Sequence, residues 1–64
     1  MDDELSKLFS ESLDKKAIIY FYNGFRYECI IRKTFKGFLQ FTDLRKNVDR
    51  IVNISEIKEV EFLE

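Results

Sequence analysis

The stretch Ala17–Thr34, AIIYFYNGFRYECIIRKT, decides the fold of this 64-residue chain. At its centre is Asn23-Gly24, a pair that favours a tight β-hairpin because both residues tolerate a positive φ angle. Before this pair, every residue of Ala17–Tyr22 is apolar or aromatic, which predicts a strand covered on both faces. After it, apolar and polar residues alternate over Phe25–Thr34, with Ile30 as the exception, which predicts a half-buried antiparallel strand.

Shorter segments with the same character follow this hairpin. We expect strands over Phe38–Thr42, Val48–Ile54 and Lys58–Phe62, because turn-forming stretches separate them: 35–37, 43–47 and 55–57. In the N-terminal direction, Leu5, Leu8, Phe9 and Leu13 recur at helical spacing. They predict a helix from about residue 3 to 13 that packs one apolar stripe on the sheet.

The expected architecture is therefore mainly β and forms one domain, residues 1–64. An N-terminal α-helix precedes a five-stranded, strongly bent antiparallel sheet, which is expected to close into a small barrel over about residues 16–63. The long second strand has to bend to serve both halves of such a barrel. Its sequence does not mark the position of the bend.

The size of the chain favours assembly with other subunits. A domain of about 60 residues hides only about 60% of the surface that its unfolded chain exposes, so its own core is marginal. The usual reinforcements are disulfides, a metal or partner subunits. One cysteine, Cys29, and no histidine exclude an intrachain disulfide and a structural zinc site. The lone cysteine, the acidic start Met1–Glu4 and the lack of a long apolar run predict a cytoplasmic protein.

The residue types argue against an enzyme. Without histidine the commonest general base is missing, and Ser-His-Asp and Cys-His arrangements are excluded. Only Gly24 and Gly37 are present, so no glycine-rich phosphate loop exists. Cys29 lies on the apolar side of its strand, where a buried core residue is the expected role. We therefore expect no catalytic residue, no cofactor and no metal.

Charge is segregated along the chain although the net charge is only −1. Residues 1–14 carry five acids and one base, residues 15–50 nine bases and three acids, and residues 51–64 four acids and one base. The middle segment can therefore present a basic surface, or its cations can simply alternate outward on exposed strands. Arg45, Lys46 and Arg50 cluster around the third turn, where a solvated hairpin tip is the default and a phosphate contact the alternative.

Three segments resemble the Sm-like family, which includes LSm and Hfq proteins. Asn23-Gly24 is similar to the turn between the first two strands of these proteins, and Phe35–Phe41 is similar to the first Sm motif. Ile51–Phe62 is similar to the second Sm motif, with Ile57 and Val60 at its apolar positions. The chain departs from the family at Lys36, where an aspartate is usual, at Gln40, where an asparagine is usual, and in lacking the Arg-Gly pair of the second motif.

The resemblance implies an Sm-like (SH3-like) barrel that forms a homo-oligomeric ring, commonly of six or seven subunits, and binds short U- or A-rich single-stranded RNA. Transferred by position, Phe38 would stack on a base, Gln40 would hydrogen-bond its edge, Lys36 would attract phosphate and Asn53 would replace the missing Arg-Gly. The resemblance also implies a subunit interface between the fourth strand of one copy and the fifth strand of the next, with Val52, Ile54, Val60 and Phe62.

Three functions stay open at this point. The first is the RNA-binding ring, acting in RNA metabolism. The second is a degenerate Sm-like scaffold that holds protein partners without RNA, which the change at Lys36 and the missing Arg-Gly favour. The third is a monomeric SH3-like barrel that binds peptide or DNA. For single residues, a structural role is the alternative: Phe38 can belong to the core, Gln40 can be an outward strand residue and Asn53 can serve a turn.

Overall fold

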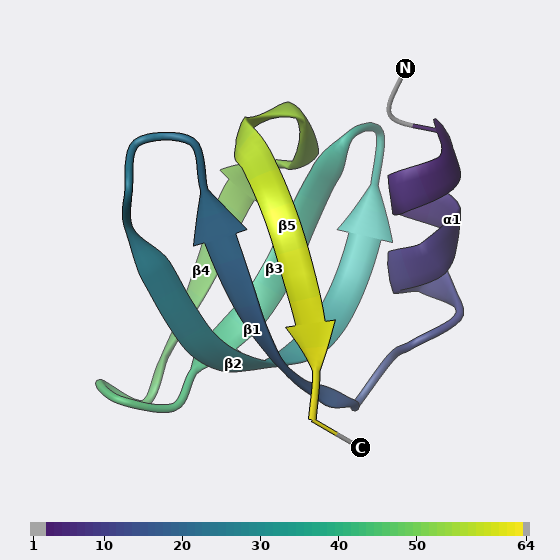
Figure 1. The fold of residues 1–64 in the computed structure, drawn as a ribbon. Coiled ribbons are helices and arrows are strands. Elements are labelled where there is room, and N and C mark those ends of the chain that lie inside the picture. The colour runs from purple at the N-terminus through teal and green to yellow at the C-terminus, as the bar shows by residue number, and fades with distance from the viewer. Residues whose placement is uncertain (1–2, 64) are drawn as a thin grey trace.

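The computed structural model describes residues 3–63. Its elements are one helix, five strands and one short 3-10 helix (Figure 1), as follows: α1 Asp3–Ser10, β1 Lys16–Phe21, β2 Arg26–Phe35, β3 Phe38–Asp43, β4 Val48–Asn53, η1 Ile54–Glu56 and β5 Ile57–Phe62. The five strands form one antiparallel sheet in the order β4-β3-β2-β1-β5. The prediction of a helix followed by a five-stranded antiparallel sheet is confirmed.

The sheet is strongly bent but open. β1 and β5 lie in front of β3 and β4 in Figure 1, and β2 runs from one layer into the other. The bend occurs at Arg32, where the register of β2 against β3 shifts between Ile31 and Lys33, as expected for a β-bulge. Within residues 3–63 no strand pairing joins β4 to β5, so the predicted closure into a barrel is not shown, and both strands are sheet edges.

The core lies between the two layers. Its fully buried members come from α1, β1, β2, β3 and η1: Phe9, Ala17, Ile19, Cys29, Ile31, Leu39, Phe41 and Ile54. Phe21 of β1 and Ile57 of β5 are nearly fully buried. Phe9 anchors α1, which lies against β2 (Figure 1). Fully burying a side chain of this size contributes about 1.5–3 kcal/mol, which outweighs the weak helicity of so short a segment.

Helix α1 ends three residues earlier than predicted. The hydroxyl groups of Ser10 and Ser12 donate hydrogen bonds to the backbone carbonyls of Lys7 and Leu8, both at 2.8 Å. Serine side chains that bond nearby backbone groups compete with further helix. Asp14 then adopts a φ of 67°, which a helix cannot contain. Leu13 is consequently 46% exposed and does not extend the apolar stripe.

The predictions for the first hairpin are correct in type and wrong in detail. Ala17, Ile19 and Phe21 are buried, but Ile18 and Tyr20 on the other face are only half-buried, because no element of the described chain covers that face. Of the Asn23-Gly24 pair only Gly24 has a positive φ, of 95°. Phe25, expected on the buried side, is exposed because it precedes β2 at the rim of the sheet.

Candidate nucleic-acid interface

The turn between β2 and β3 carries exposed aromatic rings. Lys36 and Gly37 both have positive φ angles, of 47° and 83°, as in the two-residue turns that match the twist of a hairpin. This turn places Phe35 opposite Phe38, and their ring centroids lie 6.0 Å apart at an interplanar angle of 33°. The two side chains are 42% and 39% exposed, so part of each aromatic face remains accessible.

The junction of β4 and η1 lies beside this turn. Asn53 is the register partner of Phe38, and the N–H of Ile54 donates to the carbonyl of Gly37 at 2.9 Å. Asn53 is exposed, and its side chain forms no hydrogen bond that caps η1. The structure therefore brings Lys36, Phe38 and Asn53 together at one end of the sheet. Pairing along the β-ladder between β3 and β4 connects these positions.

Gln40 does not lie at this turn. It is on the same outer face of β3 but further along the strand, opposite Ile51. Its side-chain nitrogen lies 3.4 Å from a carboxylate oxygen of Asp49. The same carboxylate accepts a bond from Thr42 at 2.8 Å, and Thr42 in turn accepts one from Arg32 at 3.0 Å. Gln40 thus belongs to a polar network across the outer face, in which its amide nitrogen is directed at Asp49.

Sequence reasoning missed Lys33 and Phe35, which extend the aromatic surface on β2. The amine of Lys33 lies 5.9 Å from the ring centroid of Phe35, within the range of a cation–π contact. Lys33 is the register partner of Gln40 across the hairpin. Their outward position follows from the continuation of β2 through Phe35. The sequence did not reveal it, because the bulge at Arg32 reverses which residues of the strand face outward beyond that point.

The edges of the sheet expose unpaired backbone groups. In antiparallel ladders, residues that bond to the neighbouring strand alternate with residues whose N–H and C=O point away. The bond from the Ile54 N–H to Gly37 fixes this alternation in β4. The backbone N–H and C=O groups of Asp49, Ile51 and Asn53 therefore point away from β3. The bond from the Leu63 N–H to Lys16 fixes the alternation in β5. The backbone N–H and C=O groups of Val60 and Phe62 therefore point away from β1.

Of the four predicted interface residues, one is placed in the core. Val52, Val60 and Phe62 are half-buried at the edges of the core. Ile54 is fully buried within its own chain, so its side chain exposes no area to another subunit, unlike those of the other three; the interface itself stays a prediction. Ile51, which was not predicted, is 59% exposed at the β4 edge.

A small hollow lies beside the β4 edge. Its volume is about 280 Å³, and residues of the first hairpin and of the β4–η1 region line it: Phe21, Asn23, Phe25, Tyr27, Ile51, Val52, Asn53 and Glu56. Three of these side chains, Phe25, Ile51 and Val52, leave apolar surface at the free edge. The edge therefore combines unpaired backbone groups with exposed apolar area, which favours association with another chain.

A larger and more polar groove of about 710 Å³ lies beside the β3–β4 loop. Residues of all strands except β5, and of this loop, line it: Lys16, Ile18, Arg26, Tyr27, Glu28, Asp43, Leu44, Arg45, Lys46 and Arg50. Asp43 is 2% exposed, and its carboxylate accepts bonds from the Arg50 side chain at 3.1 Å and from the Arg45 N–H at 2.9 Å. Burial acts to raise the pKa of Asp43, but these bonds and the one from the Lys46 N–H outweigh it and lower that pKa.

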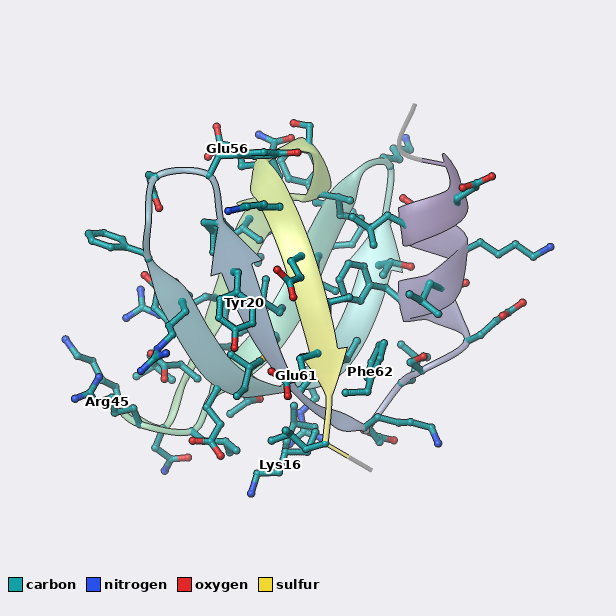
Figure 2. The ribbon with its side chains drawn as sticks, viewed as in Figure 1. Lys16, Tyr20, Arg45, Glu56, Glu61 and Phe62 are labelled. Atoms are coloured by element: carbon teal, nitrogen blue, oxygen red, sulfur yellow. The ribbon has the colours of Figure 1, made fainter. Side chains whose placement is uncertain are left out.

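Two further titratable groups, Cys29 and Tyr20, have raised pKa values. Burial, with smaller contributions from Asp43 and Glu28, raises the pKa of Cys29 to about 12, so the thiol is neutral at pH 7. Tyr20 donates a hydrogen bond to Glu61 at 3.1 Å, on the outer face visible in Figure 2. That bond, together with desolvation and the charge of Glu61, raises the pKa of Tyr20.

Comparison with protein-family models, with curated proteins and with solved structures finds no match. Across residues 3–63, no helix is long and apolar enough to cross a membrane. In the same range no three His, Cys, Asp or Glu side chains gather as a metal ion would require.

Proposed function

We propose that the chain is an Sm-like subunit that assembles with copies of itself and binds short U- or A-rich single-stranded RNA. The observation that carries this proposal is the meeting of the β2–β3 turn with the β4–η1 junction. It places an accessible phenyl ring, an amide and an ammonium group, those of Phe38, Asn53 and Lys36, at one end of the sheet.

These three groups supply the interactions that single-stranded RNA requires. Unstacked bases bind by stacking on aromatic rings and by hydrogen bonds from amides to their edges. Each base–aromatic stack contributes about 1–3 kcal/mol. Lys36 adds attraction for phosphate that the usual aspartate of the family would not. Gln40, whose side-chain amide nitrogen lies beside Asp49 and away from the turn, has a secondary role.

Assembly is supported by the two free edges. β4 and β5 each present backbone groups without a strand partner in the described chain, and the exposed side chains of Ile51 and Val48 flank the first of them. Pairing β4 of one copy with β5 of the next would satisfy both edges at once. Repetition of that contact produces a ring when the rotation between subunits closes. The Phe38 turns of the copies would then form a repeated binding surface.

The proposal is tested by the mass of the particle and its RNA affinity. Light scattering during size-exclusion chromatography should give a mass of several chains. Fluorescence anisotropy with labelled oligo-U and oligo-A should show binding that weakens as salt rises, because phosphate contacts release counterions. A multimer without RNA binding at low salt would instead support a protein scaffold. A folded monomer at high concentration would refute the ring.

A further inference from the structure

We propose that the groove beside the β3–β4 loop is a second RNA contact, which holds phosphate groups and does not read bases. This inference rests on the proposed function, because it assumes that the natural ligand is single-stranded RNA. The groove lies at the other end of the molecule from η1: Arg45 and Lys16 lie at the lower end of Figure 2, and Glu56 lies at the upper end. The Phe38 turn is at the η1 end, since the Ile54 N–H bonds to Gly37.

The charges lining the groove leave an excess of cations. Five basic side chains face two acidic ones, a difference of +3. Both acids already have partners, because Asp43 is paired with Arg50 at 3.1 Å and Glu28 with Lys16 at 3.6 Å. The remaining three cations, Arg26, Arg45 and Lys46, form no ion pair with any residue in the range 3–63. Unpaired cations around one concave surface attract a polyanion.

The backbone that carries Arg45 and Lys46 is held in place from within. The buried carboxylate of Asp43 accepts the Arg45 N–H, and the Leu44 N–H donates to the carbonyl of Glu28 at 3.0 Å. Asn47 closes the loop with a φ of 58° and an N–H bond to the carbonyl of Asp43. The loop therefore presents its two cations from a fixed backbone, which reduces the ordering cost of binding.

The groove has no free aromatic face on which a base could stack. Tyr27 is its one aromatic residue, and the Arg50 guanidinium lies over the ring at 5.0 Å. Phe21 packs edge-on against the same ring at 5.6 Å, and Phe41 lies at 5.6 Å in a tilted arrangement. Binding here should therefore depend on phosphate charge and be independent of sequence, whereas the Phe38 turn offers a base platform.

The test compares two doubly substituted chains with equal loss of charge. Arg45→Gln with Lys46→Gln removes both loop cations and keeps the backbone N–H groups that Asp43 accepts. Lys7→Gln with Lys15→Gln, at exposed positions on α1 and directly before β1, is the matched control, because neither residue lines the groove or lies on an edge strand. Affinities for labelled oligo-U, oligo-A and a mixed-sequence RNA are measured by anisotropy over a series of salt concentrations, and thermal unfolding confirms that each variant folds.

We expect the loop variant to lose affinity equally for all three RNAs. Each single-strand phosphate contact contributes about 0.7 to the slope of log K against log salt, so two lost contacts should reduce the slope by about 1.4. Each halving of the salt concentration should then increase the ratio of the wild-type to the variant binding constant by about 2.6-fold. The control should keep the wild-type slope.

The outcomes separate this inference from the function on which it rests. If the wild type binds RNA and the loop variant keeps the wild-type slope of log K against log salt, the RNA contact at the groove is refuted and the Phe38 site is unaffected. Equal losses in the loop variant and the control would also overturn it, because net charge alone would then explain the effect. A loss confined to one RNA sequence would contradict phosphate-only contact. Failure of the wild type to bind RNA at low salt would instead refute the proposed function.

Discussion

Replacing Ile51 by proline should break the assembly while leaving the subunit folded. The Ile51 N–H points away from β3, so a proline here removes no hydrogen bond from the sheet of the subunit itself. Proline is tolerated on edge strands when its missing N–H faces outward. The Ile51 side chain is 59% exposed, so little buried area is lost. In the assembly, by contrast, the same N–H would face β5 of the next copy.

The expected loss in association free energy follows from the loss of one hydrogen bond at each contact between subunits. An intramolecular hydrogen bond contributes a net of about 1 kcal/mol, and we take the same value for one between subunits. Each subunit contact would then weaken about fivefold. A closed ring of about six copies contains as many contacts as subunits, so the variant ring would lose about 6 kcal/mol in total. A loss of this size should convert most of the particle to smaller species in dilute solution.

Two matched variants make the result interpretable. Ile51→Ala truncates the same side chain and keeps the N–H, so its assembly should resemble wild type if the backbone drives association. Val52→Pro removes an N–H directed at β3, and it should destabilise the subunit itself. Sedimentation over a dilution series gives the mass, and circular dichroism reports folding. An Ile51→Pro chain with wild-type mass at every concentration would refute the role assigned to the β4 edge.

Three further outcomes follow from individual side chains. Phe38→Ala should lower RNA affinity about 5- to 150-fold, the equivalent of about 1–3 kcal/mol for a lost stack. Tyr22→Ala removes an aromatic ring elsewhere that is more exposed, 71% against 39% for Phe38, and it should leave the anisotropy curves unchanged. The Cys29 thiol, with its pKa raised to about 12, should resist Ellman's reagent at pH 8 until urea unfolds the chain, and rapid reaction of the native protein would contradict its burial. Because the pKa of Asp43 is lowered from its usual 3.8, its contribution to stability is complete above that value and is lost as pH falls through the lowered pKa. Thermal melts between pH 2 and 6 should show this acid slope, and Asp43→Asn should flatten it.

Local patterns in the sequence predict most of the fold. The strand predicted over Val48–Ile54 is present as β4, in which half-buried Arg50 and Val52 alternate with exposed Ile51 and Asn53. Strand bounds agree within about a residue, because Gly24 and Gly37 interrupt the pattern where the chain turns. The same patterns could not locate the bend at Arg32, since a bulge depends on how two strands pair and not on one residue type.

The candidate site was less predictable because it depends on pairing between distant segments. Spacing could not show whether Phe38 is core or surface, and the structure leaves it partly exposed beside Asn53. For Gln40, the sequence motif predicted a role that the neighbouring strand changes. Its place in a motif suggested a base contact, yet Asp49 from the neighbouring strand engages its amide. Likewise, the burial of Asp43 beneath Arg50 depends on a hairpin that joins residues seven positions apart.

The charges on the two edge strands favour pairing of unlike edges. A contact between two β5 strands would bring Glu59 and Glu61 of both copies onto one outer face, and like charges across a strand pair are destabilising. It would also leave both β4 edges, with exposed Ile51, without a partner. A contact between β4 and β5 brings three acids onto that face instead of four, because Asp49 is the one acid among the outer residues of β4. Like-edge pairing stops at a dimer, so a dimeric particle would contradict this preference, and a larger closed one would support it.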